Sequence, residues 1–174
     1  MGVGIKLSKA EMAGWTERLA AWREFAQLEA DTLTALSGLD LSVTGEVDGF
    51  SPCVAMEIGL GAPTERGDLR VIVEMEQDHL SMLGCTMFGE DATDEMLLDM
   101  LGEIANTAAG AFARRALADS AVLTMGLPTR VSVDLAREYL SQSDAACVVS
   151  LGTSDSSVRL RIHIGTKARE SVAA

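Results

Sequence analysis

The sequence is poor in basic residues: 14 lysines and arginines stand against 26 acidic residues in 174, a formal net charge of −12. This deficit argues against nucleic-acid binding, which requires a basic surface for the phosphates, and against binding to an anionic membrane. No apolar run approaches the roughly 18 residues of a membrane helix, and the start, MGVGIKLSKAEM, lacks the features of a secretory signal. We therefore expect a cytoplasmic protein without nucleic-acid or membrane partners.

Cysteine and histidine are also scarce. Cys53, Cys85 and Cys147 are odd in number and widely spaced, so they predict neither a disulfide framework nor a zinc site. We expect three small buried hydrophobic side chains in a reducing compartment. His163 alternates with apolar residues near the end of the chain, and we expect it on a solvated strand face with no ligand role. Nothing in the sequence around His79 indicates a ligand role either, and we expect no metal site.

Hydrophobic periodicity predicts a mixture of helices and strands. Ser8 and Glu11 form a capping box before a helical pattern over residues 9 to about 36, which ends near Gly38. Downstream we expect strands near 41–47 and 53–60, a strand over 69–75 with one partly solvated face, a short helix over 78–87 ended by Gly89, a helix from 91 or 93 to about 118, a loop and a strand within 122–134, and a closing hairpin of strands 146–151 and 158–164.

The 48% apolar content is high enough for a core, and no linker divides the chain. We therefore predict one α+β domain over residues 1–174, in which an antiparallel sheet carries packed helices. Residues 1–38 are expected to form an N-terminal helical region packed on that domain.

The helix expected over 94–118, DEMLLDMLGEIANTAAGAFARRALA, carries the most informative pattern. At about 100° per residue, one side of the helix collects apolar residues and is expected to be buried: Leu97, Leu101, Ile104, Ala108 and Phe112. The opposite side collects a different set: Asp99, Glu103, Asn106 and Gly110, with Gly102 beside them.

This second side has an unusual composition. Asn106 is the only asparagine in the chain, and it lies in mid-helix, where asparagine is unfavourable. Gly102 and Gly110 each cost a helix interior about 1 kcal/mol relative to alanine, and a surface glycine allows another backbone to come close. We therefore expect a partner to dock on this side, although a solvated polar helix face without function remains the alternative.

Glu103 and Asn106 lie three residues apart and project side by side. A carboxylate can pair with a cation, and an amide can hold a water molecule in a fixed orientation. No nucleophile stands beside a base here, which argues against nucleophilic catalysis. Positioning a water for in-line attack on a phosphoryl group requires mainly geometry and electrostatics, so that chemistry is compatible with the pair.

At these residues the sequence resembles the CheC/CheX/FliY family of chemotaxis phosphatases. The active helix of that family carries an acidic or serine position, then Glu, then Asn, with a proline further along the chain. The corresponding residues here are Asp99, Glu103, Asn106 and Pro128. The string LGEIANTAAGAF is similar to the CheX form of the helix, and the first helical region offers no second asparagine. The resemblance is therefore to a CheX-like member with one site per chain.

The resemblance implies an antiparallel sheet with packed helices and a phosphatase that acts on the aspartyl phosphate of a CheY-like response-regulator receiver. It implies that Glu103 engages the receiver's lysine and Asn106 orients the attacking water, with Asp99, Gly102 and Gly110 in contact with the partner. Magnesium would be supplied by the receiver, and the chain would form a homodimer. The alternative is a receiver-binding or flagellar-switch-like scaffold module without catalytic activity on the same fold.

Overall fold

The computed structural model describes residues 26–27, 29–35, 37–44, 49–64, 67–116, 125–142 and 147–167. Its centre is a six-stranded antiparallel sheet of strand order β1-β5-β6-β3-β2-β4. The strands are β1 (Leu41–Thr44), β2 (Val54–Thr64), β3 (Gly67–Met75), β4 (Thr129–Val131), β5 (Cys147–Thr153) and β6 (Arg159–Lys167). The helices are α2 (Gln77–Phe88), α3 (Asp94–Ala116) and α4 (Val133–Gln142), preceded by helical residues 26–27, 29–35 and 37, here called the N-terminal helical segment. The predicted α+β class and antiparallel sheet are confirmed.

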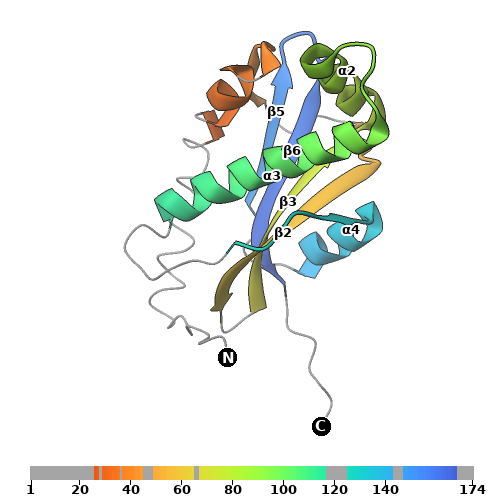
Figure 1. The fold of residues 1–174 in the computed structure, drawn as a ribbon. Coiled ribbons are helices and arrows are strands. Elements are labelled where there is room, and N and C mark those ends of the chain that lie inside the picture. The colour runs from red at the N-terminus through yellow and green to blue at the C-terminus, as the bar shows by residue number, and fades with distance from the viewer. Residues whose placement is uncertain are drawn as a thin grey trace.

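One face of the sheet carries most of the helical structure. Helix α3 crosses this face, and α2 and the N-terminal helical segment lie on the same side (Figure 1). The side of α3 predicted to be buried is buried, from Leu97 to Phe112. It packs into one core with Val71, Val73 and Met75 of β3. Burying each large apolar side chain contributes about 1.5–3 kcal/mol, so this contact fixes which side of α3 points away from the sheet.

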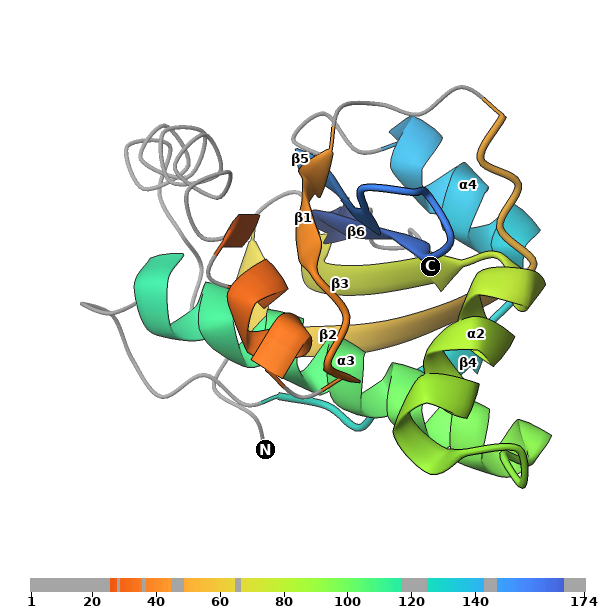
Figure 2. The same ribbon diagram turned by 90° about the horizontal axis from the view of Figure 1, so that it is seen from above.

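The other face of the sheet is covered in part by α4, which lies opposite α3 (Figure 2). The sequence pattern did not predict a helix after β4. Ser132 caps α4, because its Oγ accepts a hydrogen bond from the backbone N–H of Leu135 at 3.1 Å. Ala136 of α4 packs against Ala55 and Ile72 in a second, smaller core.

Several expectations about exposure are wrong because of this second covered face. Residues Ile72 and Glu74 of β3 were expected on a partly solvated face, but both are buried. His163 was expected to be solvated, but it is 2% exposed, and its Nε2 lies 2.7 Å from Oε2 of Glu74. In the opposite sense, Cys53 and Cys85 are exposed thiols rather than buried side chains. The side-chain burial of Cys147 lies outside the described residues.

Two glycines end helices as predicted. Gly38 has φ +72° and donates its N–H to the carbonyl of Thr34, and Gly89 has φ +81° and donates to that of Cys85. Positive φ values cost glycine little. Helix α2 starts at Gln77 after Glu76, one residue before the predicted start at position 78.

The described part of the first predicted helix packs on the sheet through Ala26, Ala30 and Leu33. Its earlier part, including the capping box at Ser8 and Glu11, lies outside the described residues. Across the described residues, none of the helices combines the length and apolar character that crossing a bilayer requires.

Candidate functional site on helix α3

The start of α3 is set by its first turn. The backbone N–H of Met96 donates to Oγ1 of Thr93 at 3.3 Å, which makes Thr93 the cap, one of the two starts that the sequence predicted. Asp94 and Glu95 follow in the first turn, where acidic side chains interact favourably with the helix dipole. This cap fixes where α3 begins, and the buried apolar side fixes its rotation relative to the sheet.

The polar side of α3 faces away from the sheet. Asp99 and Glu103 are exposed, and Asn106 is half-buried. Nδ2 of Asn106 donates to Oε1 of Glu103 at 3.5 Å, the upper limit for a hydrogen bond. The two side chains therefore lie side by side, as the sequence predicted. The hydrogen bond between them is long enough that a stronger partner of Glu103 can replace the amide.

The two glycines of this helix differ from the prediction. We expected Gly102 and Gly110 to be exposed beside Asn106, but both are buried. A β-carbon on Gly102 would lie 3.4 Å from Cβ of Pro128. The segment that lies over Gly102 therefore belongs to this chain, and assigning these buried glycines to partner contact is not supported. Asp99 keeps the exposure that a partner contact requires.

The segment Met125–Pro128 is anchored to β2. The N–H of Gly126 donates to the carbonyl of Gly59 at 2.8 Å, and Met125 forms an isolated bridge with Leu60. This anchoring holds Pro128 against α3 at Gly102, the residue just before Glu103. Leu127, just before it, is 87% exposed, which is unusual for a leucine of a folded domain. Pro128 thus packs against the candidate site directly before β4 begins.

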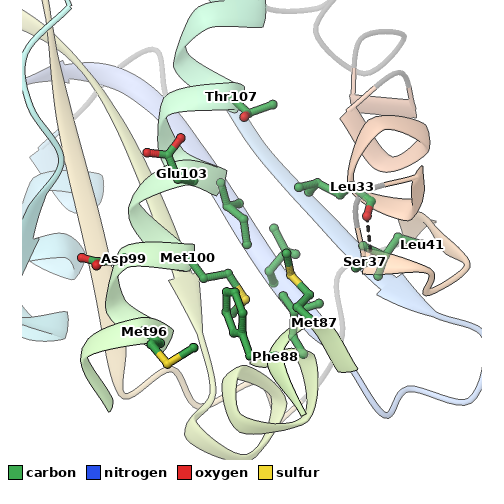
Figure 3. A pocket seen from close by; sticks show the side chains of 13 residues that line it. Leu33, Ser37, Leu41, Met87, Phe88, Met96, Asp99, Met100, Glu103 and Thr107 are labelled. Carbon is green, nitrogen blue, oxygen red and sulfur yellow. Dashed lines mark hydrogen bonds between the residues drawn. The ribbon is translucent and has the colours of Figure 1, made fainter. Parts of the chain in front are cut away.

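A groove lies between α3, α2 and the N-terminal helical segment. It has a volume of about 470 Å³, and Figure 3 shows the side chains that line it. Most are apolar, including Leu33, Met87, Phe88 and Met100. Asp99 and Glu103 also line this groove, so the ridge of polar residues on α3 borders it. The sequence pattern did not predict the groove, because it brings residues 33–41 and Leu160 together with residues 83–107, and these parts are far apart in the chain.

Metal-ligating side chains do not cluster in the part of the chain that is described: no group of three or more His, Cys, Asp or Glu residues could hold an ion there. The acidic residues of the candidate site instead point outward from one helix. Such an arrangement can bind a cation or cationic side chain contributed by a partner. The amide of Asn106 adds one donor group and one acceptor beside it.

Comparisons of sequence and of structure give different results. No family model matches the sequence, and no curated protein matches it. In structure, the chain is similar to the chemotaxis protein CheX of Vibrio vulnificus, with 16% identity, a TM-score of 0.58 and coverage of 81% of this chain and 91% of that one. It is also similar to CheX of Borrelia burgdorferi, solved in a complex with CheY, BeF3 and Mg²⁺, with 15% identity, a TM-score of 0.62 and coverage of 88% and 97%.

The same fold occurs in a flagellar protein. The FliM middle domain of H. pylori has 12% identity, a TM-score of 0.57 and coverage of 92% of this chain and 94% of that one. The chain is therefore an α+β domain with the fold of the CheX- and CheC-like chemotaxis proteins, a fold that the FliM middle domain shares. The resemblance drawn from the helix motif is confirmed at the level of the fold.

Proposed function

We propose that this protein is a phosphatase of the CheC/CheX/FliY family that removes the phosphoryl group from the aspartate of a response-regulator receiver. One observation carries the proposal: on a CheX-like fold, Glu103 and Asn106 lie side by side on the outward side of α3, within 3.5 Å of each other and not buried. Asn106, the only asparagine of the chain, supplies at this position the carboxamide that water positioning needs.

In the proposed mechanism, the ridge of α3 enters the receiver's phosphorylation site. The carboxylate of Glu103 pairs with the receiver's lysine, which aligns the two proteins. The carboxamide of Asn106 holds a water in line with the scissile bond. The water oxygen bonds to phosphorus as the bond between phosphorus and the aspartyl oxygen breaks, and inorganic phosphate and a free aspartate result. Magnesium at the receiver's own site would neutralise charge on the phosphoryl oxygens.

The partner assignment has support from a structural neighbour. The Borrelia CheX was solved together with CheY, BeF3 and Mg²⁺. For this chain, the exposed acidic residues Asp99 and Glu103 offer the charge that would attract a lysine. We further propose, from the resemblance alone, that two copies form a homodimer and that the protein acts in the cytoplasm.

A second candidate function is a receiver-binding scaffold without catalytic activity. It is favoured by the similarity to the FliM middle domain, which has a TM-score in the same range as the CheX structures. A scaffold needs the same docking surface but has no need for an unfavourable asparagine in mid-helix. We therefore rank it second.

A time course distinguishes the two functions. The purified protein is mixed with magnesium and with each phosphorylated receiver encoded in the same genome, and phosphate release is followed against the receiver's own rate of hydrolysis. The phosphatase predicts faster release from at least one receiver. Binding of a receiver without faster release would support the scaffold and contradict the phosphatase.

A further inference from the structure

The groove beside α3 presents apolar side chains to solvent. Its floor includes Leu41, Ile104 and Leu160, and its lip includes Met87 and Phe88 of α2, which are 37% and 41% exposed. Apolar surface that is kept in contact with water costs about 25 cal/mol per Å². Contiguous apolar surface of this kind marks an interaction site in soluble proteins. Methionine side chains, which are flexible and polarisable, adapt to a range of apolar partners.

The charge around the groove has one sign. Both charged residues that line it, Asp99 and Glu103, are acidic. Apart from Leu160, the lining residues lie within 33–41 and 83–107, and neither stretch contains a lysine or an arginine. The arginines on either side of Leu160, Arg159 and Arg161, pair with Glu76 and Glu74. An anionic ligand such as a fatty acid or a phospholipid would meet repulsion at this rim. The chemistry of the groove therefore suits an apolar occupant flanked by positive charge.

Polar groups that could orient a small molecule are few in the groove. Oγ of Ser37 already donates to the carbonyl of Leu33 at 2.6 Å, as Figure 3 shows. The remaining uncharged polar lining residue is Thr107, next to Asn106 in α3. Specific small-molecule sites place several polar groups around an apolar pocket. A groove between helices with apolar walls is instead typical of sites that receive the apolar side of another helix.

The groove and the candidate catalytic ridge share two residues. Asp99 and Glu103 belong to the polar side of α3 and also line the groove (Figure 3). A protein that contacts Glu103 therefore lies over the rim of the groove. This continuity, together with the charge of the rim, indicates that one partner occupies both surfaces.

We infer that the groove binds a solvent-exposed apolar patch on a helix of the receiver, whose edges carry lysine or arginine. This inference rests on the proposed function and extends it, because it assigns recognition and chemistry to different residues. Met87 and Phe88 contribute affinity through apolar contact. Asp99 selects basic edges by charge, and Asn106 acts on the water.

The test compares two methionines of α2. Met87 lines the groove, whereas Met82 does not, although it is 49% exposed. Met87→Glu and Met82→Glu add the same negative charge to the same helix, so a difference between them reports the lost apolar contact. Each purified receiver from the same genome, activated with BeF3 and Mg²⁺, is titrated into wild type and both variants by calorimetry, and thermal unfolding verifies that the variants fold.

We expect Met87→Glu to weaken binding of the cognate receiver by about tenfold or more, which corresponds to about 1.4 kcal/mol, and Met82→Glu to change it less than about twofold. In turnover, Met87→Glu should raise KM more than it lowers kcat. Asp99→Asn should weaken binding and reduce its dependence on salt. Equal affinities of the two glutamate variants would overturn the groove assignment.

The outcomes separate this inference from the proposed function. If Met87→Glu binds like Met82→Glu while the wild type releases phosphate, the groove assignment is wrong and the phosphatase stands. If Met87→Glu alone loses affinity but the wild type releases no phosphate, the groove assignment stands and the phosphatase is wrong. If the wild type binds none of the activated receivers, both are wrong.

Discussion

Asn106 and Glu103 are joined by one long hydrogen bond, 3.5 Å from Nδ2 to Oε1, at the outward side of α3. The contact is local to the helix, because the two residues are three positions apart. Neither side chain is buried. The pair is therefore positioned by the helix and its packing, and it is open to a partner. The proposed division of roles, with charge on one residue and water orientation on the other, can be tested residue by residue.

Asn106→Ala should lower the rate of receiver dephosphorylation by about 100-fold, about 2.7 kcal/mol of barrier, while affinity for the receiver changes little. The reason is that the carboxamide acts on the water and makes little of the contact area. Gln27→Ala is the matched control, because the exposed Gln27 is likewise a helical amide that donates to a carboxylate, Asp31, at 3.1 Å. Single-turnover phosphate release measures the effect. A variant at position 106 with the wild-type rate would exclude the water-positioning role.

Glu103→Lys should weaken receiver binding by about tenfold, because it places a cation against the receiver's lysine. Glu95→Lys makes the same charge change in the first turn of α3, at a residue that does not line the groove, and should have a smaller effect. Affinities measured at two salt concentrations separate direct pairing from the general field of the protein. If the two variants lose affinity equally, Glu103 has no direct contact with the lysine.

The elements near the candidate site could be predicted well from the sequence. Helix α3 spans 23 residues, and its apolar periodicity and the capping threonine at position 93 are local signals that tertiary contacts did not override. The pairing of Glu103 with Asn106 follows from helix geometry alone. The positions of Gly38 and Gly89 marked helix ends for the same local reason.

Features that depend on distant segments could not be predicted. The alternation in β3 and β6 does not reveal that α4 covers the second face, so His163 and Glu74 were wrongly placed in solvent. Gly102 was expected to face a partner, but the sequence does not show that Pro128 of the same chain lies over it. The signal for α4 was present at Ser132, a capping residue before the helix.

The buried pair of His163 and Glu74 should matter for stability rather than for activity. Among the described residues, Oε1 of Glu74 and Nδ1 of His163 have no hydrogen-bond partner, and Nε of Arg161 lies 3.9 Å from Oε2 of Glu74, too far for a hydrogen bond. The bond between His163 and Glu74 is therefore the main compensation for burial. His163→Ala should lower the free energy of unfolding by about 3 kcal/mol, because it leaves a buried carboxylate without this partner. Arg137→Ala, which breaks the exposed pair with Asp134, should cost less than about 0.5 kcal/mol. Urea unfolding of both variants measures the difference, and similar losses would contradict it.

Two glycine substitutions test how closely α3 is packed on either side of the candidate site. A β-carbon on Gly84 of α2 would overlap Cδ2 of Leu97, a core side chain that is 5% exposed. Gly84→Ala should therefore lower the free energy of unfolding by about 1–3 kcal/mol, despite the helix propensity of alanine. A β-carbon on Gly102 would make ordinary contact with Pro128 at 3.4 Å. Gly102→Ala should therefore be neutral or stabilising by up to about 1 kcal/mol. If Gly102→Ala destabilises as much as Gly84→Ala in urea unfolding, Pro128 lies closer to α3 than this geometry allows. The space between α3 and Pro128 beside Glu103 is then smaller than 3.4 Å leaves for a β-carbon.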